Sequence, residues 1–249
     1  YDPDYQAWYY LKEDGVYVTG TYTINGSSHF FKDNGKWVQE LPKGFEKGHY
    51  SKTIFLDPGH GGRDSGAYYY GIAEKDLNLQ VSRKLRKRLE KLGYTVLTSR
   101  DSDVDVDFVT ERSRMVNKTN ADFFISIHFN ATGNDTTLNL GIQTYSYKED
   151  AGYPSKINQY WHNNPDRMSE SNRLAADLHS SLLTETGARD AGLLQATFAV
   201  LRETAKPAVL LELGYMDNPE ENQRIRSDQY QDKLVEGIIK GIQKYYAGN

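Results

Sequence analysis

Apolar residues in most of this chain fall into two patterns, which alternate from Thr53 onward. Short runs that are apolar on both faces include TIFLDPGH, DFFISIHFN and PAVLLELGYM. Runs of this kind are typical of strands that are covered on both sides. Further strands are predicted at residues 94–100, 141–147 and 198–203.

Between the strands, apolar residues recur with helical spacing. The first predicted helix extends from about Ala73 to Leu92 and ends at Gly93. Its apolar face consists of Leu77, Val81, Leu85, Leu89 and Leu92. Other helices are predicted at residues 109–120, from a serine cap at Ser169 to Thr186, and across 221–246, with a polar loop at about 148–167. The pattern predicts an α/β fold with a mostly parallel, twisted sheet and helices on both faces.

Residues 1–40 have a different texture, rich in aromatics, Gly and Asn, and they repeat. The segment WYYLKEDGVYV returns as HFFKDNGKWV after about 20 positions, with Tyr9 and Tyr10 aligned to Phe30 and Phe31. Each unit is predicted to form two short strands joined by a turn at EDG or DNG. We therefore divide the chain into a hairpin repeat segment (1–40), a linker (41–52) and a main domain (53–249).

Composition narrows the range of functions. The net charge is −4 and cysteine is absent, so nucleic acid is not an expected partner, and a metal must be held by His, Asp or Glu. The basic run from Arg83 to Arg88 lies within a helical pattern and is interpreted as a solvated helix face. No apolar run approaches the roughly 20 residues of a membrane span. The chain begins without Met or a signal peptide, as expected of a mature or trimmed product.

Three predicted strands end in a residue suited to metal binding or proton transfer. These residues are His60, His128 and Glu212. Sites in parallel sheets form beyond the carboxyl ends of the strands, so the three side chains are expected to meet. A hydrolytic zinc ion takes three protein ligands and keeps one position for water, so the two histidines need a partner carboxylate.

Glu74, at the start of the first helix, is the best candidate for that carboxylate, with Asp64 and Asp76 as alternatives. The glycine-rich loop before Glu74 allows the chain to turn back toward the histidines. Asp57 is expected either to orient an imidazole or to cap the turn into Pro58. His162 is a weaker candidate ligand.

Several motifs together resemble a known family. LDPGHGGRDSGA, GIAEKDLNL, ADFFISIHFNA and FAVLRETAKPAVLLELGYMDNPEE, in this order, resemble the zinc-dependent N-acetylmuramoyl-L-alanine amidases of the amidase-3 type. The resemblance implies one zinc ion bound by His60, Glu74 and His128, with Glu212 as the catalytic residue. Residues 141–169 show no clear match to the blocking helix of autoinhibited relatives.

The function implied by the resemblance is hydrolysis of the amide between N-acetylmuramic acid and L-alanine in peptidoglycan by zinc-activated water. Glu212 would take the proton from that water and pass it to the departing amine. Two alternatives stand beside it: a zinc peptidase of similar architecture, and a catalytically silent wall-binding protein, which the intact set of four residues argues against. The implied location is extracellular, at the cell wall.

Residues 1–40 resemble the cell-wall-binding repeats of Gram-positive surface proteins and phage lysins, which are related to choline-binding repeats. The resemblance implies cell-wall teichoic acid or choline as a partner, through cation–π attraction to stacked rings. An aromatic hairpin that packs on the main domain is the alternative interpretation.

Overall fold

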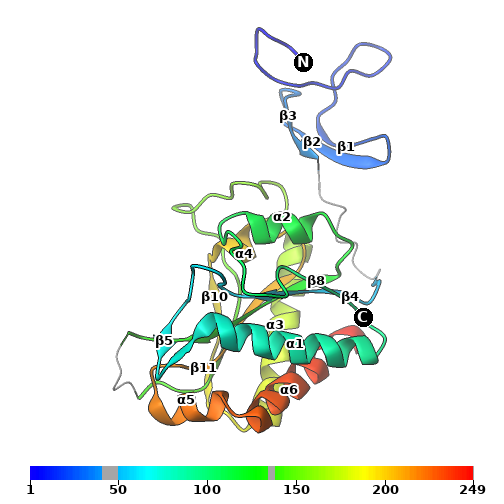
Figure 1. The fold of residues 1–249 in the computed structure, drawn as a ribbon. Helices are drawn as coiled ribbons and strands as arrows, with labels where there is room; N and C mark the ends of the chain where they lie inside the picture. The colour runs from blue at the N-terminus through cyan, green and yellow to red at the C-terminus, as the bar shows by residue number, and fades with distance from the viewer. Residues whose placement is uncertain (41–49, 134–137, 249) are drawn as a thin grey trace.

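A computed structural model describes residues 1–40, 50–133 and 138–248. At its centre lies a six-stranded sheet in the order β10-β9-β11-β8-β4-β7 (Figure 1). The strands are β4 (Thr53–Pro58), β7 (Thr95–Thr98), β8 (Phe123–Asn130), β9 (Ile142–Tyr147), β10 (Asp190–Ala196) and β11 (Ala208–Tyr215). All neighbouring strands are parallel except β9 and β11, which are antiparallel. The predicted mostly parallel sheet is confirmed.

Helices cover both faces of this sheet (Figure 1). They are α1 (Glu74–Lys91), α2 (Glu111–Asn117), α3 (Pro165–Thr186), α4 (Ala199–Arg202), α5 (Pro219–Ile225) and α6 (Asp228–Ala247). Side chains alternate along the strands, so Ile54 and Leu56 join the core under α1, α3 and α6, while Phe55 faces the smaller core under α2 and α4. Each face of the sheet therefore has its own apolar core.

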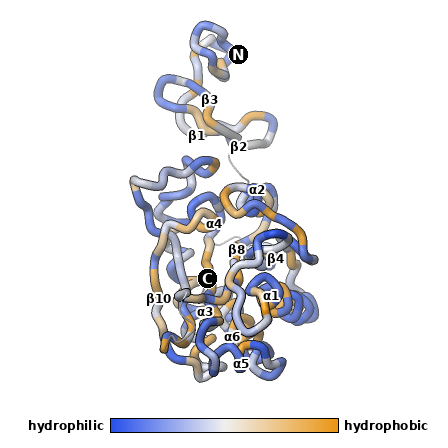
Figure 2. Tube along the Cα trace, turned by 60° about the vertical axis from the view of Figure 1, so that its left-hand side comes forward, coloured by the Kyte–Doolittle hydropathy of each residue, from blue (hydrophilic) through white to orange (hydrophobic). Residues whose placement is uncertain are grey.

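The basic run on α1 lies on the outer side of that helix, as predicted. Leu85 is buried, whereas Arg83 and Lys87 are exposed. Figure 2 shows hydrophilic residues along α1 and hydrophobic ones toward the interior. Within the described part of the chain, every helix is too short or too polar to cross a membrane.

The N-terminal segment contains a three-stranded antiparallel sheet of β1 (Gly20–Ile24), β2 (Ser27–Phe31) and β3 (Trp37–Glu40). The turns at residues 13–15 and 33–35 are closed by equivalent backbone hydrogen bonds 20 positions apart. This register aligns Tyr10 with Phe30, whereas the predicted alignment paired Tyr9 with Phe30. The prediction of two strands per unit was wrong for the first unit, where the pairing is a single bridge between Leu11 and Tyr17.

The division into three segments stays a prediction, because residues 41–49 of the linker lie outside the described residues.

One predicted strand was wrong. Residues 198–203 contain the short helix α4, and the strand is β10, which lies just upstream. β10 is an edge strand with largely exposed side chains, so it lacks the apolar run of a central strand. Val200 and Leu201 of α4 are apolar because they pack into the smaller core. A short apolar run does not distinguish a strand from a buried helical turn.

Two helix boundaries also differ from the prediction. α3 begins at Pro165 with Asn164 as its cap, not at Ser169, because the Asn164 side chain accepts a hydrogen bond from the backbone N–H of Arg167 at 3.0 Å. The predicted closing helix is two helices, because Ser227 caps a new start for α6 after α5 has ended.

Candidate metal centre and active site

The three candidate ligands come from three different elements. His128 lies in β8, His60 follows the end of β4, and Glu74 is the first residue of α1. β4 and β8 are parallel neighbours, and the Gly59 N–H donates to Ile127 O at 3.0 Å, which continues their pairing up to His60. Adjacent parallel strands thus deliver both imidazoles to the same edge of the sheet.

Glu74 joins the two imidazoles. Its Oε2 lies 3.1 Å from His60 Nε2, and its Oε1 lies 2.9 Å from His128 Nδ1. One ligand atom from each of the three residues lies within 4.8 Å of the others. The structure therefore brings together the set that the sequence favoured.

The alternative ligands lie outside this group. Asp64 is instead a partner of His60, whose Nδ1 lies 2.8 Å from Asp64 Oδ2. Asp76 is exposed on α1. His162 pairs with Tyr147, with 3.2 Å between its Nδ1 and the tyrosine hydroxyl.

The carboxylate of Glu74 is held firmly. It is 5% exposed and accepts hydrogen bonds from the backbone N–H groups of Ala67 and Phe129 and from the Asn78 side chain. Burial opposes ionisation of Glu74, but the hydrogen bonds and charges of the two histidines outweigh it and hold its pKa well below the ordinary value. Asn78 was not predicted from the sequence, although it lies one helical turn after Glu74.

Two glycines make room for the cluster. A Cβ built on Gly59 would lie 2.1 Å from His128 Cε1, so that ring packs directly against the backbone. A Cβ on Gly66 would lie 2.5 Å from Glu74 Oε2, and Gly66 also has a φ of +61°. The glycines around His60 thus allow close approach of the other two side chains.

Asp57 has neither of its predicted roles. It is completely buried and accepts hydrogen bonds from Ser99, Ser126 and Arg112. Burial opposes its ionisation, but the Arg112 guanidinium and the two hydroxyls outweigh this and lower its pKa. Arg112 also donates to the His60 carbonyl oxygen at 2.8 Å, so Asp57 acts on the backbone of His60 through Arg112. Arg112 was not predicted, because in the sequence it is one charged residue of an ordinary helical pattern.

Glu212 lies beside the cluster on β11, where it is in register with His128 of β8. The residue is partly exposed overall, but its Oε2 is buried and has no hydrogen-bond partner in the described part of the chain. Burial, with a smaller contribution from the charge of Glu74, raises the pKa of Glu212 well above its ordinary value. A raised pKa makes this carboxylate a stronger base than an ordinary glutamate.

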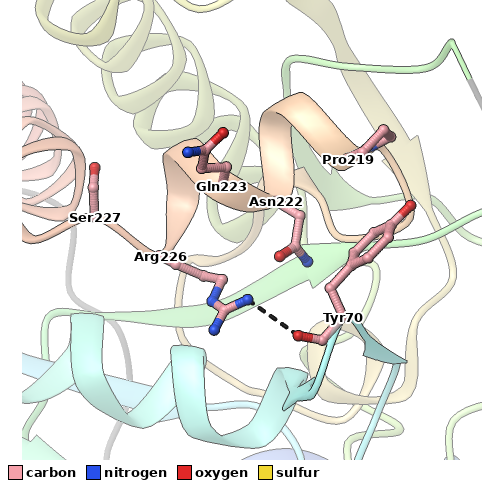
Figure 3. A pocket seen from close by; sticks show the side chains of 6 residues that line it. All are labelled: Tyr70, Pro219, Asn222, Gln223, Arg226 and Ser227. Atoms are coloured by element: carbon pink, nitrogen blue, oxygen red, sulfur yellow. Dashed lines mark hydrogen bonds between the residues drawn. The ribbon is translucent and has the colours of Figure 1, made fainter.

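Two pockets lie near these elements. One, of about 290 Å³, adjoins His60 and His128. The other, of about 410 Å³, lies between α5 and the hairpin of β5 (Tyr68–Tyr69) and β6 (Ile72–Ala73). Figure 3 shows Arg226 donating to the Tyr70 carbonyl oxygen across this second pocket. None of the predicted site residues lines it.

The comparisons with known proteins agree with this architecture. The family model described as N-acetylmuramoyl-L-alanine amidase matches residues 54–244. The chain is 34% identical over 195 residues to the N-acetylmuramoyl-L-alanine amidase CwlM of Bacillus licheniformis, covering 78% of this chain and 68% of CwlM.

Two further similarities span the same region. The N-acetylmuramoyl-L-alanine amidase LytC of Bacillus subtilis is 32% identical over 195 residues, covering 78% of this chain and 36% of LytC. A solved N-acetylmuramoyl-L-alanine amidase from Clostridium difficile 630 superposes with a TM-score of 0.68 at 36% identity, covering 79% of this chain and 97% of that one. This chain therefore belongs to the N-acetylmuramoyl-L-alanine amidase family.

Proposed function

We propose that this amidase hydrolyses the bond between N-acetylmuramic acid and L-alanine in peptidoglycan, with one zinc ion held by His60, Glu74 and His128 and with Glu212 as the proton carrier. The observation that carries the proposal is the meeting of two imidazoles and one carboxylate beside the buried Oε2 of Glu212, which has no hydrogen-bond partner among the described residues. Family membership supports the same reaction.

The donor set fits zinc. Two imidazole nitrogens and one carboxylate oxygen, without sulfur, are the ligands of open hydrolytic zinc sites. When bound, zinc polarises the amide carbonyl and lowers the pKa of a coordinated water toward about 7. Asp64 supports this use of His60, because its contact with Nδ1 turns Nε2 toward the cluster.

The remaining chemistry belongs to Glu212. Its carboxylate accepts the proton of the attacking water and then donates it to the amine of L-alanine as the amide bond breaks. A raised pKa suits both halves of this exchange, because the group must first take the proton and then give it up. The neighbouring position of Glu212 and His128 in the sheet keeps the proton carrier next to the metal ligands.

For the N-terminal segment we propose wall binding, outside the cell. The segment has a pocket of about 720 Å³, whose lining includes aromatic rings and two carboxylates, from Tyr1, Tyr5, Tyr9, Tyr17, Asp2 and Asp4. Lys36 also lines this pocket, and its Nζ lies 5.9 Å from the centroid of the Tyr5 ring. The aromatic rings and carboxylates that remain would attract a cationic group such as choline or the positively charged substituents of teichoic acid.

Metal analysis and amine release test the enzymatic proposal. The purified protein should contain one zinc equivalent and should release a new L-alanine amine from purified walls. A peptidase would instead release amines at other residues, and a silent protein would release none. His60→Ala and His128→Ala should lose both metal and activity, whereas the control His162→Ala should keep both. A full zinc equivalent in either of the first two variants would exclude that residue as a ligand.

A further inference from the structure

The backbone that carries His60 leaves β4 in a left-handed conformation. His60 has a φ of +59°, and Gly61 and Gly62 follow with φ values of +134° and +58°. A left-handed conformation is unfavourable for a residue with a Cβ, and it persists only where the surrounding structure holds it. We call residues 58–63 the His60 turn. The direction of the His60 imidazole therefore depends on the groups that hold this turn.

Side chains of the segment 100–112 hold the His60 turn. Asp103 Oδ1 accepts a hydrogen bond from the Gly62 N–H, and Asp105 Oδ1 accepts one from the Arg63 N–H, each at 2.7 Å. Hydrogen bonds from backbone amides to a carboxylate are stronger than neutral ones. Both carboxylates are therefore occupied by the turn.

Arg100 binds the carbonyl groups of the same region. It is 4% exposed, and its side chain donates four hydrogen bonds within the described part of the chain. Nε donates to Pro58 O at 2.9 Å, and Nη1 donates to Ser102 O at 3.2 Å. Nη2 donates both to Gly59 O at 2.9 Å and to Lys75 O at 2.8 Å. All four acceptors are backbone carbonyl oxygens.

The two contacts of Arg100 Nη2 join the segments that carry two candidate metal ligands. Gly59 directly precedes His60, and Lys75 directly follows Glu74. One nitrogen atom of a planar, rigid guanidinium thus connects the end of β4 to the first turn of α1. The distance between the His60 and Glu74 side chains, 3.1 Å from Nε2 to Oε2, depends on this connection.

A general contribution to packing does not account for Arg100. Burial of a guanidinium without a carboxylate partner is unfavourable, and the partners of this side chain among the described residues are carbonyl oxygens. Arg112, which has Asp57 as its counter-ion, donates to the same Pro58 carbonyl oxygen at 2.9 Å, so two like charges lie together. The contacts of Arg100 to both ligand segments explain why such a residue is buried here.

We propose that Arg100 is a positioning residue of the metal centre, which holds the backbones beside His60 and Glu74 at the separation that a bound zinc ion requires. The inference rests on the proposed function, because it takes these two residues as metal ligands. Arg100 acts on them through the carbonyl groups of Gly59 and Lys75. It does not line the 290 Å³ pocket.

The test measures metal binding rather than turnover. Arg100→Lys keeps the positive charge, but a single ammonium nitrogen cannot replace the planar fork that reaches four carbonyls. Competition with a chelator should show zinc affinity lower by about 10- to 100-fold, as expected when support for metal ligands is lost. The absorption spectrum of the cobalt-substituted protein reports the geometry of the ligands, and it should change in this variant.

Arg167→Lys is the matched control. Arg167 is also completely buried, and its guanidinium also donates to backbone carbonyl oxygens, those of His162, Leu201 and Lys206. None of these three residues is next to a candidate ligand in the chain. The control should keep the zinc affinity and the cobalt spectrum of the wild type, even where its melting temperature falls. All affinities should be measured well below the melting temperature of the zinc-free proteins.

The possible outcomes separate the two proposals. Wild-type zinc affinity and an unchanged cobalt spectrum in Arg100→Lys would overturn the positioning role, and so would equal losses of affinity in Arg100→Lys and Arg167→Lys. Arg100→Met, which removes the buried charge, replaces Arg100→Lys if the lysine variant does not fold. A wild-type protein that binds zinc but releases no L-alanine amine would contradict the proposed function, and the affinities of the variants would still decide the role of Arg100.

Discussion

At the scale of single residues, two local features define the candidate site. One is the carboxyl oxygen of Glu212 that is unpaired in the described part of the chain, and the other is the close contact between the His128 ring and Gly59. Glu212 Oε2 has no hydrogen-bond partner among the described residues, so its carboxyl group is free to exchange a proton. The His128 ring lies against Gly59, which has no side chain to displace it. Both features are local, and each can be changed by one substitution.

The Glu212→Gln variant should retain zinc, but its turnover number should fall. The amide preserves the size of the side chain but cannot accept a proton from water, and general acid–base catalysis is typically worth about 10²- to 10⁴-fold. Zinc content, melting temperature and turnover should be measured on one preparation. The exposed Glu220→Gln provides the control. Near-wild-type turnover per zinc-loaded molecule would remove Glu212 from the mechanism.

Gly59→Ala should weaken metal binding. The added methyl group would overlap the His128 ring, so the ring must move away from the cluster. Loss of support for a metal ligand usually costs about 10- to 100-fold in affinity. Competition with a chelator measures the affinity, and Gly152→Ala, where the nearest atom is an Asp150 side-chain oxygen at 3.2 Å, is the matched control. Equal affinities for the two variants would show that the His128 ring tolerates the methyl group.

At the scale of elements, helix starts depend on specific caps rather than on the apolar pattern. α3 has a candidate serine at residue 169, but the chain is already helical there, and Ser169 is exposed. The Asn164 cap lies five residues before Ser169, and the helix starts directly after it at Pro165.

Asn164→Ala should therefore destabilise the protein by about 0.5–2 kcal/mol, because a backbone N–H at the start of α3 loses its acceptor. Ser169→Ala should change the free energy of unfolding little, since alanine is favoured inside a helix. Urea unfolding of both variants gives the comparison. The assignment of the cap fails if Ser169→Ala is the more destabilising change.

At the scale of the whole molecule, the N-terminal segment touches the main domain at Tyr160. Thr21 Oγ1 donates to the Tyr160 hydroxyl at 3.1 Å, and the rings of Phe30 and Tyr160 lie 4.8 Å apart. These contacts involve neither the metal cluster nor Glu212. Tethering of an enzyme to its polymer acts mainly by raising the local concentration.

Removal of residues 1–40 should leave hydrolysis of soluble muropeptides nearly unchanged and reduce activity on whole walls. Full-length Tyr160→Ala is the control, because it loses the contacts and keeps the repeats. Rates on both substrates and the melting temperature should be compared. Unfolding of the truncated protein would identify the segment as structural and contradict the anchoring proposal.

The sequence by itself determined the elements that carry the candidate site. The apolar runs that end in His60, His128 and Glu212 are local patterns, and a parallel sheet places such ends at one edge. The helix that begins at Glu74 was likewise predicted from the helical spacing of its own apolar residues. The strands themselves were predicted correctly because each depends on residues that are close together in the chain, but β8 continues to Asn130 and β11 to Tyr215, beyond His128 and Glu212.

Only the tertiary structure decided how the site is supported. Arg112 and Asp57 are 55 positions apart, and the contact between Gly59 and the His128 ring joins β4 to β8. The tertiary structure also decided which of two neighbouring segments forms a strand. Residues 190–196 pair at the edge of the sheet as β10, whereas Val200 and Leu201 of α4 pack into the smaller core. No local pattern encodes such pairs, because their energies depend on burial and packing that exist only once distant segments have met.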